Sequence, residues 1–583
     1  MVMQQNKGIV NISTIGNNEE KNAIDIFHTL KIMKVVRIGQ FFNSVKRCGV
    51  NVSDLILLLL LMPFYHLKSV PTLVKSGLGS DRGVECSNSV FYDLKNNPKV
   101  NWRSLLYLVA IRFKNLADVI NTEAVNSVRA FIFDDSPLPK SGIKTELVSR
   151  VHDHVSGGFI FGYKILVMGY WDGLSFYPLD FSFHREKGSQ VDDVKKRLTT
   201  ANKRLSVQRQ VVKECCQSLK EVQQKCKLIK KENRVTKTAK KQVETANNRV
   251  IRAKQKLKTE KTKYAELENK AIELRSELKA TRKRHPNYGL TKKQMSEQFT
   301  KHREIGCPGA QRVAEADIKK TSMMMTMLKR AIKRGFRADY VLTDSWFFNL
   351  ELVKLVSKLN KKHNINLISM AKMGASKYKL TANGNYYNAI ELAAKFERKA
   401  VKARSHKAKY IKVPVTFGDI RINLFFIKIG QSKSWNLLAT TDLAINFQKL
   451  MDVYQIRWSI ELFFRESKQN LKLGKCKSTC FDAQIADATI SLVQYTILSF
   501  HRRIMDYSSF DGIFASALED AMQYSIASEL QKIFLIIIEI FSSFAGVDVI
   551  ELTRSFFRDE QTSNRIKQLN PVFYQNIVKH QAA

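Results

Sequence analysis

The residues best suited to chemistry lie in one short stretch near residue 460, with the sequence YQIRWSIELFFRESK. On a helical wheel, five of its side chains fall within one arc of roughly 80°: Tyr454, Arg457, Glu461, Arg465 and Lys468. The opposite side is apolar, as expected for a helix that packs on a core. One face therefore presents a single carboxylate among a phenol and three cations. An ordinary amphipathic helix with a solvated charged face would show the same pattern, so other parts of the chain must decide its meaning.

Further acids stand at the ends of two predicted strands. In the stretch VRAFIFDDS, β-favouring residues run into Asp134 and Asp135, and ADYVLTDSWF places Asp344 after β-favouring residues. A strand-end aspartate is most often a turn or helix cap. Together with Glu461, however, these acids would supply the oxygen ligands that Mg²⁺ or Mn²⁺ prefers. Two such ions can activate a water or a 3′-hydroxyl and stabilise the leaving oxygen at phosphorus, which predicts phosphoryl-transfer chemistry.

The order of the predicted elements would bring these acids together. Three strands in residues 126–190, followed by a helix, a strand, a helix and a strand in 291–375, form the order of a ribonuclease-H-like core. In that order the first and fourth strands are neighbours, so the acids at their ends would meet. A β-rich insertion domain is predicted at 376–445, and the helix with Glu461 at 446–480. The predicted fold class is therefore a multidomain α/β protein with a ribonuclease-H-like catalytic core.

The charge of the chain indicates a polyanionic partner. The formal net charge is +43 over 583 residues, which suits nucleic acid better than a membrane surface or an acidic polymer. No stretch reaches the roughly 18 apolar residues that a membrane span needs, so no membrane partner is expected. The N-terminus lacks a secretory pattern, and eight scattered cysteines fit a reducing compartment. We expect a cytoplasmic protein that acts on DNA.

A long basic insertion is predicted at 191–290. Residues 195–284 contain no Gly or Pro and hold 29 Lys or Arg against 9 Asp or Glu. Apolar residues recur there at coiled-coil spacing, with a phase break between Ile229 and Thr236. One straight helix of this length would run roughly 135 Å, too far for the next residues to return. We therefore predict an antiparallel hairpin that grips DNA or a partner subunit, with a solvated spacer as the alternative.

The remaining regions carry less information. Residues 1–20 are polar and expected to be disordered, 21–125 form a helical, cationic region predicted to bind DNA, and 481–583 form a helical C-terminal region. A zinc site is a weak alternative because its ligands have poor spacing. Its candidates are Cys476, Cys480, Cys307 and His302.

The pattern Tyr454-x₂-Arg457-x₃-Glu461-x₆-Lys468 resembles the YREK signature of the bacterial cut-and-paste DDE insertion-sequence transposases. Asp344 is similar to the second acid of that family, and Asp135 to the first. We prefer Asp135 over Asp134 because the family places this acid directly before Ser or Thr. The resemblance covers roughly residues 100–500, and the long coiled coil departs from it.

This resemblance implies a DNA transposase. Asp135, Asp344 and Glu461 would be the catalytic residues and would bind two Mg²⁺ or Mn²⁺ ions. The side chains implied to contact DNA phosphates are Tyr454, Arg457 and Lys468, with Arg465 a weaker candidate. The reaction would nick the element ends, pass through a hairpin intermediate and join the ends to target DNA.

Hairpin formation requires a flipped base held by an aromatic side chain, here Trp435 or Trp346, although either can simply pack in a core. The partners would be double-stranded DNA, at the element ends and the target, and a second copy of the chain in a homodimer on DNA. The protein would be associated with a bacterial nucleoid. The alternatives are a catalytically silent DNA-binding regulator and a magnesium-dependent nuclease that does not rejoin DNA.

Overall fold

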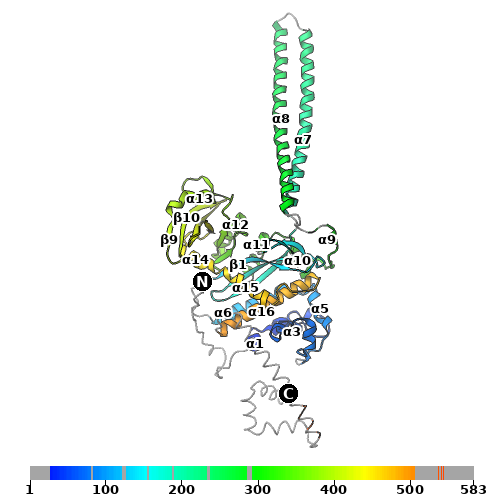
Figure 1. Ribbon diagram of the computed structural model, residues 1–583, viewed down its shortest axis with the longest axis vertical. Helices are drawn as coiled ribbons and strands as arrows, with labels where there is room; N and C mark the ends of the chain where they lie inside the picture. The colour runs from blue at the N-terminus through cyan, green and yellow to red at the C-terminus, as the bar shows by residue number, and fades with distance from the viewer. Residues whose placement is uncertain are drawn as a thin grey trace. The chain divides into compact units, whose positions relative to one another are not determined.

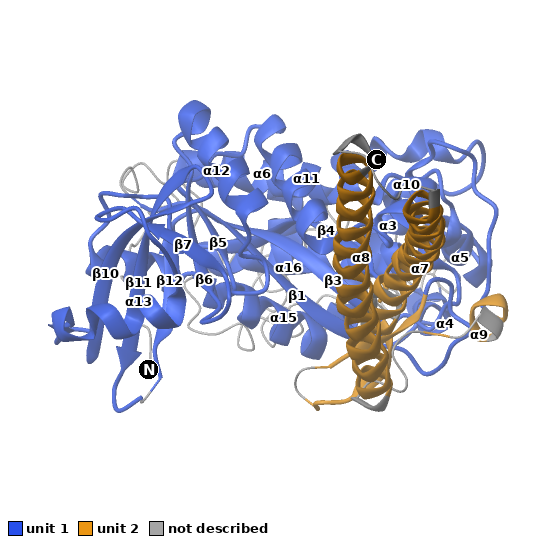
Figure 2. Cartoon of the chain, turned by 90° about the horizontal axis from the view of Figure 1, so that it is seen from above, with its two compact units in different colours: residues 1–147, 163–184, 298–583 blue, residues 148–162, 185–297 orange. Residues whose placement is uncertain are grey.

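The computed structural model describes residues 26–80, 83–120, 127–153, 156–186, 189–232, 237–284, 290, 292–432 and 434–505, and isolated residues between 533 and 543. The predictions for residues 1–20 and for most of 481–583 lie outside the described residues. The chain forms two compact units (Figure 2). Unit 1 comprises residues 1–147, 163–184 and 298–583, and unit 2 comprises residues 148–162 and 185–297.

The strands belong to one mixed sheet, in which β3 runs through both units. Their bounds are β1 Ala130–Pro139, β2 Ser149–His152, β3 Phe159–Trp171, β4 Phe176–His184, β5 Tyr340–Thr343, β6 Asn366–Ala371, β7 Lys377–Leu380, β8 Tyr386–Asn388, β9 Val401–Ala403, β10 Ala408–Phe417, β11 Ile420–Ile429 and β12 Asn436–Thr440. Within unit 2, β2 pairs with residues 159–162 of β3, and within unit 1, β4 pairs with residues 164–171.

In the central part of the unit 1 sheet, the strands lie in the order β4-β3-β1-β5-β6. β1 pairs with β5 in parallel, and β5 pairs with β6 in parallel. The prediction that the first and fourth strands are neighbours is confirmed by this pairing. β1 begins with the fully buried run Ala130 to Phe133, and all four residues of β5 are buried. Such continuous apolar runs are typical of parallel strands covered on both faces.

The segment between β6 and Glu461 continues the same sheet. β12 pairs antiparallel with β6, and the order then runs through β11, β10, β7 and β8, with β9 paired to β10. β10 and β11 form an antiparallel hairpin of ten residue pairs, and Gly418 lies in its turn with a φ of 61°. In β10 buried and exposed residues mostly alternate, whereas the six central residues of β11 are all buried. This antiparallel half therefore extends the parallel core by pairing with its last strand.

Helices cover the sheet of unit 1 (Figure 1). Their bounds are α1 Ile26–Ile32, α2 Val35–Gln40, α3 Val52–Leu61, α4 Val70–Lys75, α5 Asn88–Asn96, α6 Trp102–Ile120, α10 Pro308–Glu315, α11 Lys320–Lys333, α12 Leu350–His363, α13 Ala389–Phe396, α14 Phe447–Gln455, α15 Trp458–Asn470 and α16 Phe481–Met505, with short 3₁₀ turns at Asn43–Val45, Met62–Tyr65 and Glu397–Lys399. α16 packs against α6, α5 and β4, and most of its residues are buried. The hydroxyls of Thr489 and Thr496 donate to carbonyls one turn back in α16. Gln494 instead donates to the Leu59 and Leu60 carbonyls of α3.

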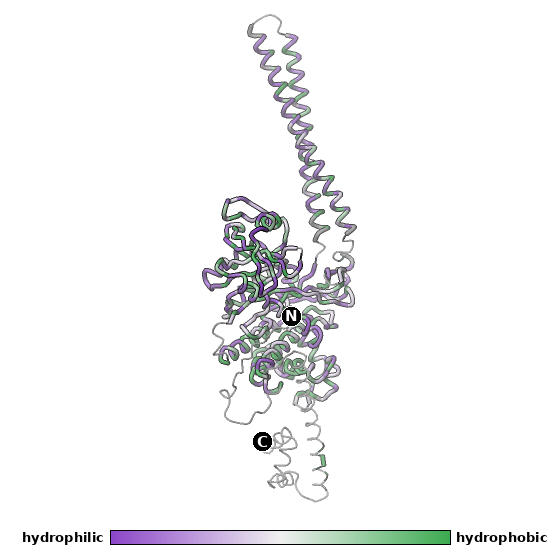
Figure 3. Tube along the Cα trace, turned by 60° about the vertical axis from the view of Figure 1, so that its left-hand side comes forward, coloured by the Kyte–Doolittle hydropathy of each residue, from purple (hydrophilic) through white to green (hydrophobic). Residues whose placement is uncertain are grey.

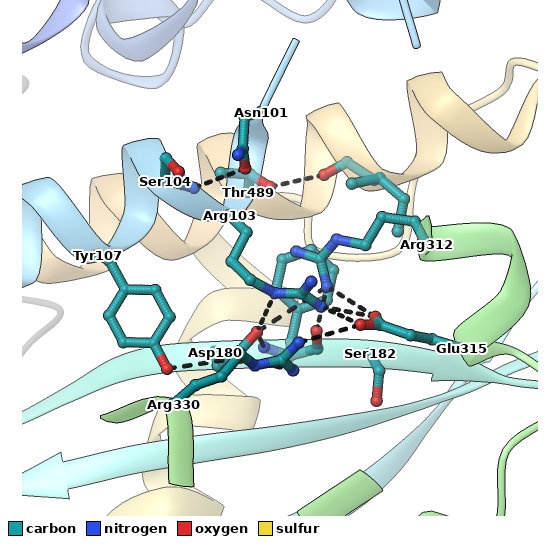
Figure 4. A network of polar contacts seen from close by, with 12 residues as sticks. Asn101, Arg103, Ser104, Tyr107, Asp180, Ser182, Arg312, Glu315, Arg330 and Thr489 are labelled. Carbon is teal, nitrogen blue, oxygen red and sulfur yellow. Dashed lines mark hydrogen bonds and ion pairs between the residues drawn. The ribbon is translucent and has the colours of Figure 1, made fainter. Parts of the chain in front are cut away.

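A buried ionic network fixes β4 to the helices around it (Figure 4). Asp180 on β4 is fully buried and accepts from Arg103 of α6 at 2.9 Å, and its carboxylate also forms an ion pair with Arg330 of α11 at 3.0 Å. Arg103 also binds Glu315 of α10 at 2.6 Å, and Arg330 binds Glu315 at 3.2 Å. Arg312 completes the group. Three helices are thus tied to one strand through two acids, in a site where removing one partner leaves buried charge.

Unit 2 contains two long consecutive helices, α7 Ser189–Glu232 and α8 Lys237–Arg284, and the short α9 Lys292–Ser296. α7 and α8 pack against each other along their length (Figure 1). Hydrophilic and hydrophobic residues alternate along both helices (Figure 3). Among the described helices of the chain, none is both long and apolar enough to cross a membrane.

We expect Asp180→Asn to lower the free energy of unfolding by about 3–5 kcal/mol, because the arginines around it would lose a buried partner. Burial alone would raise the pKa of Asp180, but Arg103, Arg330 and Arg312 outweigh it and hold the pKa below its ordinary value of 3.8. A lowered native pKa contributes stability above the unfolded value and loses it as the pH falls through the native value.

Chemical denaturation should therefore show a constant difference between wild type and variant from pH 5 to 8, narrowing only below about pH 4. The matched control is Lys114→Ala, which breaks a surface pair with Asp118 and should cost no more than about 0.5 kcal/mol. Equal losses in the two variants would contradict the role assigned to the network.

Candidate active site

The prediction that the acids end their strands holds for Asp344, which follows β5, but not for Asp134 and Asp135, which lie in the middle of β1. The parallel register pairs Ala130 with Tyr340 and Ile132 with Leu342. Continued by two residues, the same register sets Asp134 opposite Asp344, which directly follows β5. Asp135 is one position further, and successive strand residues point to opposite faces. The side chains of Asp134 and Asp135 therefore point to opposite faces of the sheet and contact different residues.

The stretch with the YREK pattern is not one continuous helix. α14 ends at Gln455 and α15 begins at Trp458, with Ile456 and Arg457 in a turn between them. The prediction of a single helix from Tyr454 to Lys468 is therefore wrong. The Ser459 hydroxyl donates to the Ile456 carbonyl at 2.8 Å, and the backbone N–H of Ser459 bonds the same carbonyl at 3.0 Å. This local bonding tightens the chain and ends the regular helical ladder.

Arg457 joins two of the acids. Its Nη2 lies 2.5 Å from Oε1 of Glu461, one helical turn along α15, and its Nη1 lies 3.5 Å from Oδ2 of Asp134. Its side chain is only 17% exposed, and its buried Nε has no partner within the described residues. Arg457 therefore joins β1 to α15 by ion pairs with Asp134 and Glu461.

Two more residues of the pattern, Tyr454 and Lys468, contact the strands β5 and β1. The Tyr454 hydroxyl donates to the carbonyl of Thr343, the last residue of β5, at 3.4 Å. Lys468 Nζ donates to Ser136 Oγ at 2.6 Å and to the Pro137 carbonyl at 3.1 Å. The pKa of Tyr454 is raised to about 12. Burial is the main cause, Asp344 and Asp134 act in the same direction, and the charge of Arg457 opposes the rise. The phenol is therefore a hydrogen-bond donor at neutral pH.

Asp135 faces a different set of residues. Its Oδ2 lies 2.6 Å from Nζ of Lys320, the first residue of α11. His184 at the end of β4 is on this side too: burial lowers its pKa to about 4, Lys320 lowers it further, and Asp135 opposes both. His184 is thus neutral at physiological pH, with its ring bonded to Ser182 and the Ile318 carbonyl. Lys320 and His184 were not identified from the sequence, because neither belongs to a motif.

The electrostatics of Asp134 show that the acids are clustered. Burial raises its pKa to about 7; the Asp135 N–H and Arg457 oppose the rise, and the charges of Asp135 and Asp344 add to it. The backbone N–H of Asp135 donates to Asp134 Oδ1 at 2.8 Å. Asp134 is therefore the acid that senses Asp344 and contacts Arg457. These contacts favour Asp134, rather than the Asp135 preferred from sequence, as the partner of Asp344 and Glu461.

The two candidate tryptophans lie in different places. The backbone N–H of Trp346 donates to Asp344 Oδ1 at 2.8 Å, and the Trp346 side chain is 53% exposed. Lys372 and Lys320 lie 4.6 Å and 5.5 Å from its ring centroid. Trp435, before β12, is half-buried with Lys428 at 4.4 Å from its ring centroid. Trp346 is thus an exposed aromatic face with cations beside an acid of the cluster.

The last predicted contact residue, Arg465, is exposed on α15, one turn beyond Glu461. The predicted zinc alternative is not supported. Burial raises the pKa of Cys476 to about 12, which keeps its thiol protonated. Cys480 lies 3.8 Å from an oxygen of Asp482, and Cys307 caps α10. These cysteines are explained by packing and capping.

The acid cluster has the donor atoms of a divalent-ion site but not its close spacing. Within the described part of the chain, no three His, Cys, Asp or Glu side chains are grouped tightly enough to hold a metal as they stand. The donor chemistry nevertheless fits, since Asp134, Asp344 and Glu461 offer only oxygen. A cation would also relieve the burial and repulsion that raise the pKa of Asp134. The Arg457 guanidinium now supplies positive charge between two of these acids.

A protein-family model matches part of the chain. Residues 302–497 match the family described as "Transposase DDE domain". This match supports a DDE transposase. It implies a ribonuclease-H-like core, in agreement with the β4-β3-β1-β5-β6 order. The matched segment contains Asp344 and Glu461 but begins after both candidates for the first acid, and it covers about a third of the chain. No curated protein matches the sequence.

We expect Asp134→Asn to stabilise the metal-free protein at pH 8 by on the order of 2 kcal/mol. A carboxyl whose native pKa is raised to about 7 holds its proton in the folded chain, so the wild type loses stability as the pH rises from about 4 through 7. The asparagine variant carries no such penalty, and its advantage should vanish near pH 4. Denaturation in a chelating buffer at both pH values measures this difference.

Asp135→Asn is the matched control, because it removes the pair with Lys320 and should give no gain at pH 8. A loss of stability in Asp134→Asn at pH 8 would show that the ionised Asp134 stabilises the fold.

Proposed function

We propose that the protein is a DNA transposase that cleaves DNA at the ends of a mobile element and joins those ends to target DNA. The observation that carries the proposal is the Arg457 bridge, which links Asp134 on β1 to Glu461 on α15. The charge of Asp344 in turn acts on Asp134. The match of residues 302–497 to the transposase DDE domain supports the same reading. The net charge of +43 fits a double-stranded DNA partner.

Asp134, Asp344 and Glu461 are the residues that would hold divalent ions, two Mg²⁺ or Mn²⁺. Asp134 replaces Asp135 in this assignment, because Asp135 is paired with Lys320 on the other face of β1. When bound, the ions supply Lewis-acid stabilisation of the attacking and leaving oxygens at phosphorus. Asp135 and Lys320 then form a supporting pair beside the acids.

The chain's own cations would position the DNA. Arg457 and Lys468 are held by the Asp134 carboxylate and the Ser136 hydroxyl, both on β1. Guanidinium and ammonium groups bind phosphate oxygens through charge-assisted hydrogen bonds. A phosphate bound here would place its phosphorus beside the acids. Tyr454 keeps its proton and donates, and exposed Arg465 extends the cationic surface along α15.

The proposed reaction alternates hydrolysis and transesterification. A water oxygen attacks the phosphorus at the element end, and the bond to the 3′-oxygen breaks as that oxygen takes a proton and leaves. The new 3′-hydroxyl attacks phosphorus of the opposite strand, losing its proton as the leaving oxygen gains one, which gives a hairpin end and excises the element. A second water then opens the hairpin and restores the 3′-hydroxyl, which attacks target DNA in strand transfer. A homodimer would hold two ends together, in a bacterial nucleoid.

We expect Asp344→Ala, Asp134→Ala and Glu461→Ala each to reduce cleavage by at least about 10³-fold while binding of end DNA is retained. The substrate is a duplex carrying the terminal inverted repeat that flanks the gene, incubated with Mg²⁺. Binding is measured by fluorescence anisotropy in Ca²⁺, and cleavage on denaturing gels.

Asp135→Ala is the control that separates the two neighbouring acids. It should retain cleavage within about tenfold, since its carboxylate pairs with Lys320. Loss of cleavage in Asp135→Ala but not in Asp134→Ala would return the first ligand to Asp135. A wild-type chain that binds ends and never cleaves would indicate a silent regulator.

We further propose that Trp346, rather than Trp435, holds the flipped base. The exposed ring beside Asp344, with Lys372 and Lys320 close to it, offers a stacking surface next to phosphate-binding charge. Base–aromatic stacking contributes about 1–3 kcal/mol per base. Trp346→Ala should therefore reduce hairpin formation by about 10- to 100-fold and leave the first nick intact.

The measurement is 2-aminopurine fluorescence at the positions next to the nick, with hairpin yield from pre-nicked ends. Trp346→Phe should recover part of both signals, and Trp435→Ala should resemble wild type. The reverse ranking of the two alanine variants would assign the flipped base to Trp435.

A further inference from the structure

The α7–α8 hairpin of unit 2 takes no part in the proposed chemistry. Three contacts fix its antiparallel register: Arg197 with Glu277, Gln208 with Glu260, and Cys226 with Asn247. The first two join charged or amide side chains, and the third joins a thiol to an amide 3.5 Å away. Contacts at both ends and near the middle show that the helices remain paired over their length.

The seam between the helices follows a strict heptad. From Val194 to Ile229 on α7, and from Val243 to Thr281 on α8, residues at alternating steps of four and three are buried or half-buried. None of these seam positions carries Lys or Arg, so the cations of the hairpin lie outside it. The seam thus holds the pair together by apolar packing, as in other coiled coils.

The positions that flank the seam carry an unusual charge pattern. In coiled coils these positions commonly hold opposite charges that select the partner helix. Arg197 and Glu277 satisfy this rule at the open end of the hairpin. Steps of seven along both helices from that pair set Arg204 opposite Lys270, Val211 opposite Lys263, Ser218 opposite Lys256 and, nearest the tip, Lys225 opposite Arg249. Cations thus face each other in two of these four pairs, Arg204 with Lys270 and Lys225 with Arg249. All four of these cations are exposed.

Like charges facing each other weaken the pairing of the helices, and the repulsion is strongest at low ionic strength. The excess is general, since residues 195–284 hold 29 Lys or Arg against 9 Asp or Glu. A spacer needs charge for solubility but gains nothing from repulsion across its own seam. A bound polyanion, in contrast, would convert each facing pair of cations into a site for one phosphate.

We propose that the α7–α8 hairpin binds along the backbone of duplex DNA, and that the phosphates stabilise the hairpin by neutralising the cations that flank its seam. At 1.5 Å per residue, α7 is roughly 66 Å long, about two turns of B-DNA. The hairpin would therefore make sequence-independent contacts that add to those of the acid site. This inference rests on the proposed function for its choice of DNA over other polyanions.

The decisive variant is Arg204→Glu with Lys225→Glu, made in the full-length chain. Each glutamate would face a cation across the seam, Lys270 or Arg249, so the hairpin should become more stable without DNA. The same change should weaken binding of a 40-base-pair duplex by about tenfold and lower the slope of log K against log salt by about 2. Hydrogen exchange of α7 and α8 peptides reports the stability, and anisotropy at several salt concentrations reports the slope.

Wild-type α7 and α8 peptides should exchange more slowly when duplex is added, and those of the variant should change little. Lys358→Glu with Lys362→Glu on α12 makes the same change in net charge on unit 1 and should leave hairpin exchange and most of the slope unaltered. An unchanged slope in the hairpin variant, or equal losses in the control, would overturn the inference. Protection by heparin but not by duplex DNA would overturn it as well.

Cleavage of end DNA is followed on the same preparations. A wild-type chain that fails to cleave, yet shows DNA-dependent protection of α7 and α8, would count against the proposed function alone. A variant that cleaves a saturating concentration of ends normally but binds with an unchanged salt slope would count against the hairpin inference alone.

Discussion

The parallel pairing of β1 with β5 is the constraint on which the site depends. Residues about 210 apart in sequence are set side by side, and only then does an acid after β5 stand level with one in β1. Everything between them must leave the sheet and return. The antiparallel pairing of α7 with α8 meets this requirement, since it brings the start of α7 and the end of α8 to the same end of the hairpin. A long insertion between paired strands costs little closure entropy beyond that of a shorter one.

The protein uses buried charge in two opposite ways. Around Asp180, three arginines outnumber two acids and lower the pKa of the aspartate, so the ionised form holds α6, α10 and α11 to β4. On β1, burial and neighbouring acids raise the pKa of Asp134, with Arg457 as partial compensation. The ion pairs around Asp180 stabilise the fold. The ionised form of Asp134, in contrast, is unfavourable, and this acid lies where the chemistry is proposed. The network around Asp180 offsets the cost of the acid cluster elsewhere in the same unit.

Sequence patterns were sufficient for the features that depend on local periodicity. The β-favouring runs before Asp134 and Asp344 predicted buried strands, and their order predicted that β1 and β5 are neighbours. The choice between Asp134 and Asp135 was beyond such reasoning. Alternation shows only that the two acids face apart, and the face that meets Arg457 is set by how α15 packs on β1. Lys320 was missed for the same reason, because its pairing with Asp135 joins residues 185 apart.

The break between α14 and α15 shows how a local bond can redirect a long-range site. Helical periodicity placed Tyr454 and Glu461 on one face of a single helix, and apolar spacing gave no sign of an interruption. The Ser459 hydroxyl and N–H both bond the Ile456 carbonyl, which puts Arg457 at the start of α15 instead of its middle. From that position one guanidinium reaches both Glu461, a turn ahead, and Asp134 on the neighbouring strand. The turn thus places Arg457 at the N-terminus of α15, where its guanidinium joins that helix to β1.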